Sequence, residues 1–261
     1  MKSLGELQDL TGRVALITGG AGHVAEAFAE ALAELGADLY LLDISEERVR
    51  LRAGDLAARF KRNIVWGVAD IGSEAQVQLA IDHALAVHGR LDILVNNAAY
   101  PPSDPSPLPE SLAEWETHLG VILTGAFLVT RASIPALKKS GRGTIVNVGS
   151  MHGLVGPDLS LYEGTSMTSE AYYAAGKGGI VQLTRYWATT LAPTVRVNCI
   201  APGGIWRGQP ESFHQRFRRR TPLGRMAREE DLKGVLAFLA SDLSAYVTGQ
   251  VIAVDGGWTA W

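Results

Sequence analysis

A tyrosine and a lysine, Tyr173 and Lys177, stand four positions apart in a segment otherwise rich in small residues. On a helix, this spacing places both side chains on one face. An ammonium group beside a phenol favours the phenolate and lowers the tyrosine pKa, which makes Tyr173 a candidate general acid or base. The same spacing also fits an ordinary amphipathic helix with a core tyrosine and a lysine whose stem covers apolar surface.

A glycine-rich turn follows the first apolar run of the chain. Residues 13–18 are rich in β-branched types and predict a buried parallel strand. Gly19, Gly20 and Gly22 come next, and the segment from Val24 to Leu35 has helical periodicity. A strand, a glycine turn and a helix N-terminus in this order present free N–H groups to a phosphate, so we expect an anion site here.

A second predicted strand, residues 38–43, ends in the carboxylate of Asp43, 24 positions after Gly19. Close to that offset, a carboxylate accepts hydrogen bonds from the hydroxyls of an adenosine ribose and repels a 2′-phosphate. Ile44 follows, with no arginine or lysine beside it, so the sequence favours NAD over NADP. The alternative is a solvated aspartate that caps the helix starting at Glu46.

Strands and helices alternate along the whole chain. Further strands are expected at residues 63–69, 91–95, 144–148, 195–200 and 251–254. Helices are expected at residues 46–62, 73–88 (with Ser73 as N-cap), 115–139, 173–191, 209–220 and 229–240, and a loop at the proline-rich residues 100–109. This alternation predicts an α/β fold: one domain over residues 1–261, with a doubly wound parallel sheet of seven strands and helices on both faces.

Composition limits the function classes that fit. The 261 residues are 47% hydrophobic and 20% charged, with a formal net charge of −3. These values fit a soluble globular protein and give no reason to expect nucleic acid or a membrane as partner. The single cysteine, Cys199, excludes an internal disulfide and fits a reducing compartment. We find no signal peptide and no uncharged apolar run long enough to span a bilayer, so we expect a cytoplasmic protein; no metal site is predicted.

Further motifs occur in the order found in short-chain dehydrogenases/reductases, and the chain resembles that family over nearly its whole length. The matching stretches are Thr18-Gly19 with Gly22, Asn96-Asn97-Ala98-Ala99, Gly143 to Ser150, Tyr173 with Lys177, Asn198 to Gly203, Pro222 to Arg225, and Thr248 to Gly257. The resemblance implies a Rossmann-type fold, a nicotinamide dinucleotide, and hydride transfer between a hydroxyl and a carbonyl carbon. It also suggests a homotetramer or homodimer.

The resemblance assigns catalytic roles to three residues. Tyr173 would donate or remove the proton on the substrate oxygen, and Ser150 would hydrogen-bond that oxygen. Lys177 would hold the nicotinamide ribose and keep the Tyr173 pKa low, and Asn96 would shape the wall beside the cofactor. Expected cofactor contacts are Gly19, Gly22, His23, Val24, Asp43, Ile44, Asp70, Ile71, Asn97, Ala98, Pro202, Gly203 and Ile205, together with Tyr173 and Lys177.

Three features depart from the family pattern. His23 and Ala25 stand where relatives usually have glycine, and Arg207 replaces a threonine near the cofactor amide. Ile122 takes the place of an asparagine in a water-linked proton relay behind the lysine, and an isoleucine forms no hydrogen bond. His118, four positions earlier on the same predicted helix, is a candidate substitute. Reduced activity would follow, and the alternative to an enzyme is a dinucleotide-binding protein with little or no redox turnover.

The substrate region contains an insertion and an arginine-rich segment. The insertion, residues 157–169, is similar to a subset of the family associated with sugars, although a surface insertion without ligand contact is equally open. Arginines gather in the expected substrate lid, residues 203–224, and guanidinium groups suit a phosphate or carboxylate. We predict an NAD(H)-dependent oxidoreductase for a secondary alcohol or ketone in a polyol or sugar-like, possibly anionic, small molecule. Its candidate substrate contacts are Met151, His152, Glu163, Arg207 and Arg216.

Overall fold

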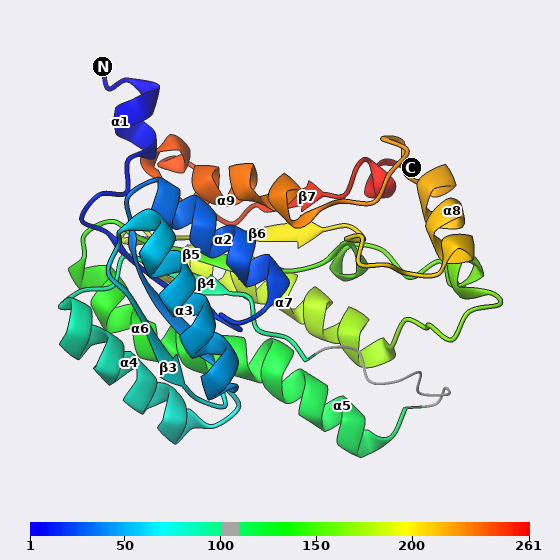
Figure 1. The fold of residues 1–261 in the computed structure, drawn as a ribbon, viewed down its shortest axis with the longest axis horizontal. Helices are drawn as coiled ribbons and strands as arrows, with labels where there is room; N and C mark the ends of the chain where they lie inside the picture. Colours follow the sequence, from blue (N-terminus) through cyan, green and yellow to red (C-terminus); the bar gives the residue numbers. More distant parts are fainter. Residues whose placement is uncertain (101–109) are drawn as a thin grey trace.

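The computed structural model describes residues 1–100 and 110–261, and its strands form one parallel sheet (Figure 1). The strands are β1 (Val14–Thr18), β2 (Asp38–Asp43), β3 (Ile64–Val68), β4 (Ile93–Asn96), β5 (Gly143–Val148), β6 (Val195–Pro202) and β7 (Val251–Val254). Their order in the sheet is β3-β2-β1-β4-β5-β6-β7. The chain winds outward from β1, returns to its other side and winds outward again, which confirms the predicted doubly wound sheet.

Helices cover both faces of the sheet, as predicted (Figure 1). One face carries α2 (His23–Glu34), α3 (Glu46–Phe60) and α9 (Lys233–Ala240), and the other carries α4 (Glu74–His88), α6 (Ala126–Lys139) and α7 (Ala171–Thr190). A separate cluster of buried apolar side chains fills the space between the sheet and each helix layer. Because helices cover both faces of the sheet at β1, all residues of this strand are buried. This explains the unbroken apolar run in the sequence.

The long helix predicted at residues 115–139 is divided by a π-helical segment. α5 (Leu112–Leu119) leads into the π turn Gly120–Gly125 and then into α6. A π turn changes which side chains share a helical face, because it adds a residue to the turn. By length and composition alone, Leu112–Lys139 qualifies as a candidate membrane span, but it contains charged residues and therefore does not contradict the expected absence of an uncharged apolar run. It packs against α4, α7 and the sheet, as a core helix of this fold does.

Several element ends differ from the prediction. An extra short helix, α1 (Leu4–Gln8), forms because Ser3 and Glu6 make a reciprocal capping box. Ser73 is the N-cap of α4, but its side chain forms no capping hydrogen bond. The predicted helix at 229–240 begins with a 3-10 turn, Glu229–Leu232, before α9. Residues 101–109 of the predicted loop lie outside the described residues.

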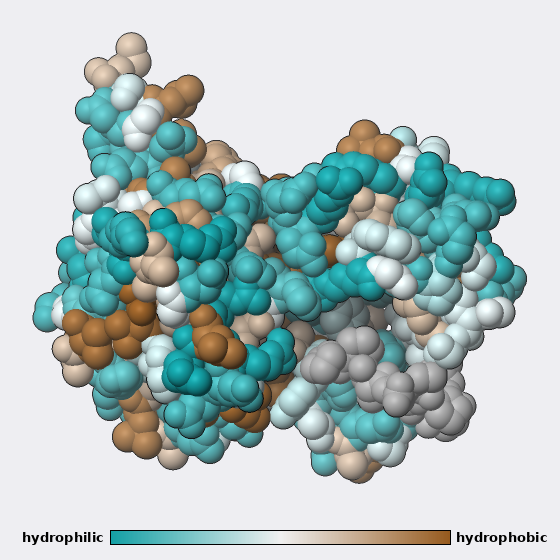
Figure 2. All heavy atoms as spheres, in the orientation of Figure 1, coloured by the Kyte–Doolittle hydropathy of each residue, from teal (hydrophilic) through white to brown (hydrophobic). Residues whose placement is uncertain are grey.

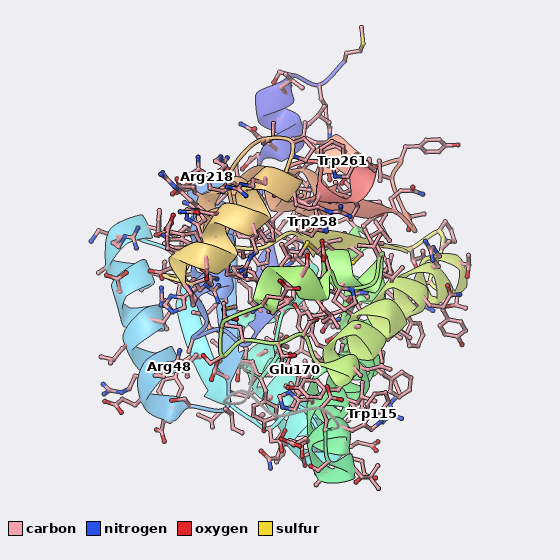
Figure 3. The ribbon with its side chains drawn as sticks, turned by 90° about the vertical axis from the view of Figure 1, so that its right-hand side faces the viewer. Arg48, Trp115, Glu170, Arg218, Trp258 and Trp261 are labelled. Carbon is pink, nitrogen blue, oxygen red and sulfur yellow. The ribbon has the colours of Figure 1, made fainter. Side chains whose placement is uncertain are left out.

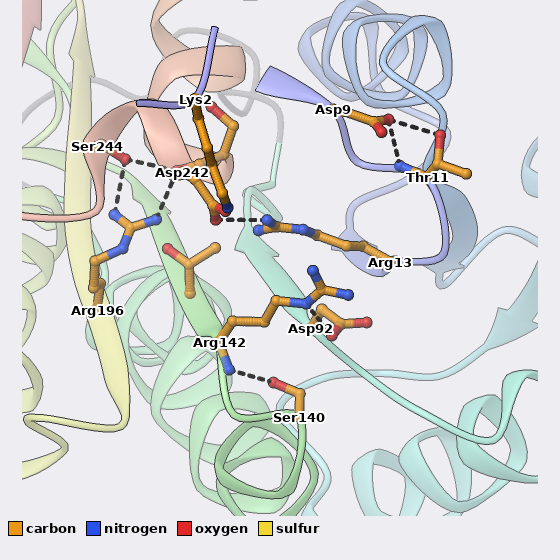
Figure 4. A network of polar contacts seen from close by, with 12 residues as sticks. Lys2, Asp9, Thr11, Arg13, Asp92, Ser140, Arg142, Arg196, Asp242 and Ser244 are labelled. Carbon is orange, nitrogen blue, oxygen red and sulfur yellow. Dashed lines mark hydrogen bonds and ion pairs between the residues drawn. The ribbon is translucent and has the colours of Figure 1, made fainter. Parts of the chain in front are cut away.

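A network of charged side chains ties down the amino ends of the strands (Figure 4). The buried Arg13 donates to the carboxylate of Asp242 at 2.5 Å. Arg196 of β6 donates to the Ser244 hydroxyl at 2.8 Å. The buried carboxylate of Asp92 accepts the N–H that begins β1, at 2.9 Å. These contacts fix the amino ends of the strands. The carboxyl ends, on the opposite side of the sheet, are left for a binding site.

Candidate active site

A cavity of about 580 Å³ lies at the carboxyl ends of the strands, where sheets of this kind bind ligands. The space-filling view shows the surface hollowed between the body of the sheet and the lobe that carries α8 (Glu211–Arg220) (Figure 2). Every residue predicted to contact the cofactor lies on the cavity wall: Gly19, Gly22, His23, Val24, Asp43, Ile44, Asp70, Ile71, Asn97, Ala98, Tyr173, Lys177, Pro202, Gly203 and Ile205.

The glycine turn after β1 lies on the cavity wall and packs closely against the segment that follows β4. Gly19 has a φ of 64°, and a Cβ atom there would lie only 2.8 Å from Ala98 Cα. Gly22 precedes α2 without any side-chain cap, so the first N–H groups of that helix remain available to an anion. His23 is exposed at the cavity wall. The imidazole of His23, which stands where relatives usually have glycine, is therefore accessible from the cavity.

The carboxylate of Asp43 is oriented by the backbone at the end of β2. One oxygen accepts the N–H of Ala21 in the glycine turn, at 3.0 Å, and the other accepts the N–H of Ser45, also at 3.0 Å. Ser45 is the N-cap of α3, so Asp43 supports the start of this helix from outside it. The carboxylate thus faces the cavity in a fixed position, which fits a ribose hydroxyl pair.

Ser150, Tyr173 and Lys177 meet on the opposite part of the same wall. Ser150 follows β5, and its hydroxyl lies close enough to the Tyr173 phenol to lower the pKa of that phenol. The Lys177 Nζ lies 5.7 Å from the centroid of the Tyr173 ring and donates to the Val148 carbonyl at 2.7 Å. The backbone N–H of His152 donates to the Ser150 Oγ at 3.2 Å and orients this hydroxyl. The three groups are therefore gathered in one place.

Burial governs the protonation of these groups. It raises the pKa of Tyr173, which the Ser150 hydroxyl and the positive charge of Arg207 partly oppose, while Glu170 raises this pKa further. Burial also lowers the pKa of Lys177 to about 8. The structure therefore contradicts the expected low pKa of Tyr173, because the cost of burying a phenolate outweighs the favourable charges. The buried Lys177 Nζ keeps one hydrogen bond, to the Val148 carbonyl.

The structure does not bring His118 into a relay with Lys177. Ile122 is buried against α7, where a Cβ added to Gly176 would lie 2.9 Å from the Ile122 Cγ2. His118 is also buried, but it stacks on the Tyr172 ring with centroids 3.9 Å apart. Neither side chain lines the cavity. Both side chains therefore pack against α7, His118 at Tyr172 and Ile122 one turn later at Gly176.

Asn96 lies beneath the cavity wall and does not form part of it. Its amide donates to the Thr130 hydroxyl at 2.9 Å and to the Asn147 side-chain oxygen at 2.8 Å. The wall is formed by Asn97, whose side chain donates to the Thr18 carbonyl at 3.0 Å. The expected role of Asn96 is corrected accordingly: it joins β4 to its neighbours by buried hydrogen bonds.

The substrate end of the cavity is largely apolar. Met151, His152 and Arg207 line it, as expected. Phe213 and Phe217 of α8 join them, within an apolar cluster that also holds Tyr162, Met226 and Trp258. The Arg207 guanidinium pairs with the Glu229 carboxylate at 3.0 Å.

Glu163 and Arg216 do not reach the cavity. The Arg216 guanidinium donates to the backbone carbonyls of Leu161, at 3.2 Å, and Glu163, at 2.5 Å, while the Glu163 side chain is exposed. Arg218, labelled on α8 in Figure 3, donates to the Gly224 carbonyl. Arg216 therefore ties α8 to the insertion, whereas Arg218 ties α8 to the turn that follows it. Tyr162 is the member of the insertion that lines the cavity.

Other wall residues were not identified from the sequence. They line the cavity but were not among the expected cofactor or substrate contacts: Leu42, Arg48, Ala69, Ala99, Tyr100, Val121, Val148, Gly149, Tyr162, Gly204, Gln209, Phe213, Phe217 and Met226.

Comparisons with known proteins agree with this geometry. A family model described as Enoyl-(Acyl carrier protein) reductase matches residues 19–259. The chain is 36% identical over 258 residues to the cis-4-hydroxycyclohexanecarboxylate dehydrogenase of Sinomonas cyclohexanicum, covering 95% of this chain and 97% of that protein. The NADPH-dependent 3-quinuclidinone reductase of Rhodotorula rubra has a TM-score of 0.89 at 27% identity, over 100% of this chain and 96% of its own. An NAD⁺-bound xylitol dehydrogenase has a TM-score of 0.86 at 29% identity, over 95% and 99%.

Proposed function

Because this chain belongs to the short-chain dehydrogenase/reductase family and is an oxidoreductase, we propose that it interconverts a secondary alcohol and a ketone with NAD(H). One observation carries the proposal: Ser150, Tyr173 and Lys177 share a cavity wall with the glycine turn and Asp43. A binding protein without turnover has no reason to keep all three groups in contact. The similarity to a dehydrogenase over nearly the whole chain also favours an enzyme.

Tyr173, Ser150 and Lys177 have different roles in the proposed reaction. The nicotinamide ring supplies the redox step when bound, by giving or accepting a hydride. Tyr173, whose raised pKa keeps the phenol protonated at neutral pH, gives its proton to the ketone oxygen during reduction. Ser150 donates a hydrogen bond to the same oxygen and stabilises the charge that develops there. Lys177 is fixed by the Val148 carbonyl and offers its remaining N–H groups to the ribose.

Residues around the cavity fit a nicotinamide dinucleotide. Gly19 and Gly22 line the cavity beside the uncapped N-terminus of α2, which suits a pyrophosphate, and Asp43 presents its carboxylate to a ribose. This carboxylate favours NAD(H) because it accepts from hydroxyls. Among the similar structures, the xylitol dehydrogenase is NAD⁺-bound and the quinuclidinone reductase is NADPH-dependent, so cofactor choice needs its own measurement.

The substrate end of the cavity suits a substrate with a compact, largely apolar carbon skeleton and an acidic group. Phe213, Phe217 and Met226 provide apolar contacts, and Arg207 provides a positive charge near Tyr173. The Sinomonas relative is named for a ring alcohol with a carboxylate, which has this chemistry. The predicted polyol or sugar-like substrate is a second candidate, favoured by the similarity to a xylitol dehydrogenase.

Oxidation of three alcohols with NAD⁺ separates these candidates. We expect kcat/KM for cis-4-hydroxycyclohexanecarboxylate to exceed that for cyclohexanol and for xylitol, followed by the absorbance of NADH. Preference for xylitol would support the polyol instead. Turnover of none of the three, with NADH still bound, would contradict both substrate classes. The homotetramer or homodimer and the cytoplasmic location are also proposals; light scattering on the purified protein tests the assembly.

A further inference from the structure

The adenosine end of the cavity contains a positive charge next to Asp43. Arg48 projects from the first turn of α3, drawn in light blue in Figure 3, and lines the cavity together with Asp43 and Ile44. Its Nη2 donates to the Ala21 carbonyl at 3.2 Å. The N–H of the same Ala21 donates to the Asp43 carboxylate at 3.0 Å. The guanidinium and the carboxylate are thus both held by the backbone of one residue of the glycine turn, on the same cavity wall.

The charge of Arg48 is poorly compensated. Within residues 1–100 and 110–261, the neutral Ala21 carbonyl is its one hydrogen-bond partner, and no carboxylate pairs with it. Arg52, one turn later on α3, pairs with Glu26. The Asp43 carboxylate, in contrast, accepts a backbone N–H at each oxygen. Several guanidinium N–H groups of Arg48 therefore remain available to an anion at the cavity wall.

We propose that Arg48 binds the 2′-phosphate of NADP(H), so that this chain binds NADP(H) as well as NAD(H). An arginine near this ribose accommodates the 2′-phosphate in folds of this kind, and a guanidinium fork binds phosphate in a bidentate manner. Asp43 would accept hydrogen bonds from the ribose hydroxyls of NAD(H). With NADP(H), the positive charge of Arg48 would offset the repulsion between Asp43 and the 2′-phosphate. The inference rests on the proposed function only in taking the ligand to be a nicotinamide dinucleotide.

Binding titrations with NADH and NADPH test this role without any substrate, by the fluorescence of the reduced cofactor. The wild-type Kd for NADPH should lie within about tenfold of the Kd for NADH. Arg48→Gln should raise the NADPH Kd by about tenfold or more, because it removes a charge-assisted hydrogen bond, and the NADH Kd by less than about threefold. Arg50→Gln is the matched control: Arg50 is exposed on the same helix and does not line the cavity, so both Kd values should be unchanged.

A second variant tests the opposing charge. Asp43→Asn should tighten NADPH binding, and this gain should be smaller when Arg48→Gln is also present. NADH binding with no measurable NADPH binding in the wild type would overturn the inference, as would equal weakening of both cofactors by Arg48→Gln. Binding of neither cofactor by the folded wild type would instead contradict the proposed function. Equal melting temperatures of the wild type and Arg48→Gln show that the variant is folded.

Discussion

Lys177 Nζ lies over the ring of Tyr173, 5.7 Å from its centroid, and is bonded to the Val148 carbonyl. The lysine side chain is only 4% exposed, and burial lowers its pKa from 10.5 to about 8. A pKa shift of this size corresponds to about 3 kcal/mol in favour of the neutral amine. Lys177 therefore destabilises the folded chain at neutral pH, which fits the role proposed for it in the reaction and not a stabilising one.

Lys177→Met should stabilise the protein while it removes activity, because an apolar side chain of similar length replaces a buried ammonium. Losing the partner of the Val148 carbonyl costs about 1–3 kcal/mol, so the net gain at pH 7 should be about 1–2 kcal/mol. Urea unfolding of both proteins measures the free energy of unfolding. Lys139→Met, at an exposed position, is the control and should change it little.

The same pair of proteins gives a pH dependence with a definite sign. The folded-state pKa of Lys177 is below its unfolded value, so the wild type gains stability from this group as pH rises from about 8 towards 10.5. The advantage of Lys177→Met should therefore be largest at pH 7 and shrink by pH 10. An advantage that stays constant over this range would contradict a buried, titrating ammonium.

Gly176 is required for the contact between α7 and the π segment. A Cβ atom there would lie 2.9 Å from Ile122 Cγ2 and 3.2 Å from Leu119 Cδ2. Gly176→Ala should lower the free energy of unfolding by about 1–3 kcal/mol through overpacking. Gly178→Ala on the same helix meets nothing within 4 Å and should raise it by about 0.5–1 kcal/mol. Thermal unfolding measures the stability of both variants. A higher melting temperature for Gly176→Ala than for Gly178→Ala would contradict this packing.

Arg207 should distinguish acidic from neutral substrates. Its guanidinium lines the cavity and is half-exposed beside Glu229. Arg207→Gln should raise KM for cis-4-hydroxycyclohexanecarboxylate by about tenfold, because a charge-assisted hydrogen bond is lost, and leave KM for cyclohexanol within about twofold. Steady-state kinetics with both alcohols measure the difference. Equal changes in the two KM values would show that Arg207 does not contact the acidic group.

The position of the proposed cofactor contacts on one cavity wall was predictable, because it depends on local signals. Gly19 and Asp43 follow apolar runs that read as parallel strands, and the carboxyl ends of parallel strands meet at one edge of the sheet. Residues directly after those strands were therefore brought together by the topology alone.

The remaining parts of the wall depend on packing between distant segments. Arg48 faces the cavity only because α3 lies against the glycine turn, a contact that joins residues far apart in sequence. Arg216 was assigned to the substrate because its charge is visible in the sequence, whereas its backbone partners at Leu161 and Glu163 are not. The pKa of Tyr173 was misjudged because burial depends on the whole fold.

Tyr173→Phe tests the central claim most directly, by kcat and NADH Kd measured on the same preparation. The variant keeps the ring over which Lys177 lies and removes only the hydroxyl that carries the proton. We predict that kcat falls by about 100-fold or more, while the NADH Kd stays within about threefold. Retention of most of the turnover would contradict Tyr173 as the general acid and base of this site.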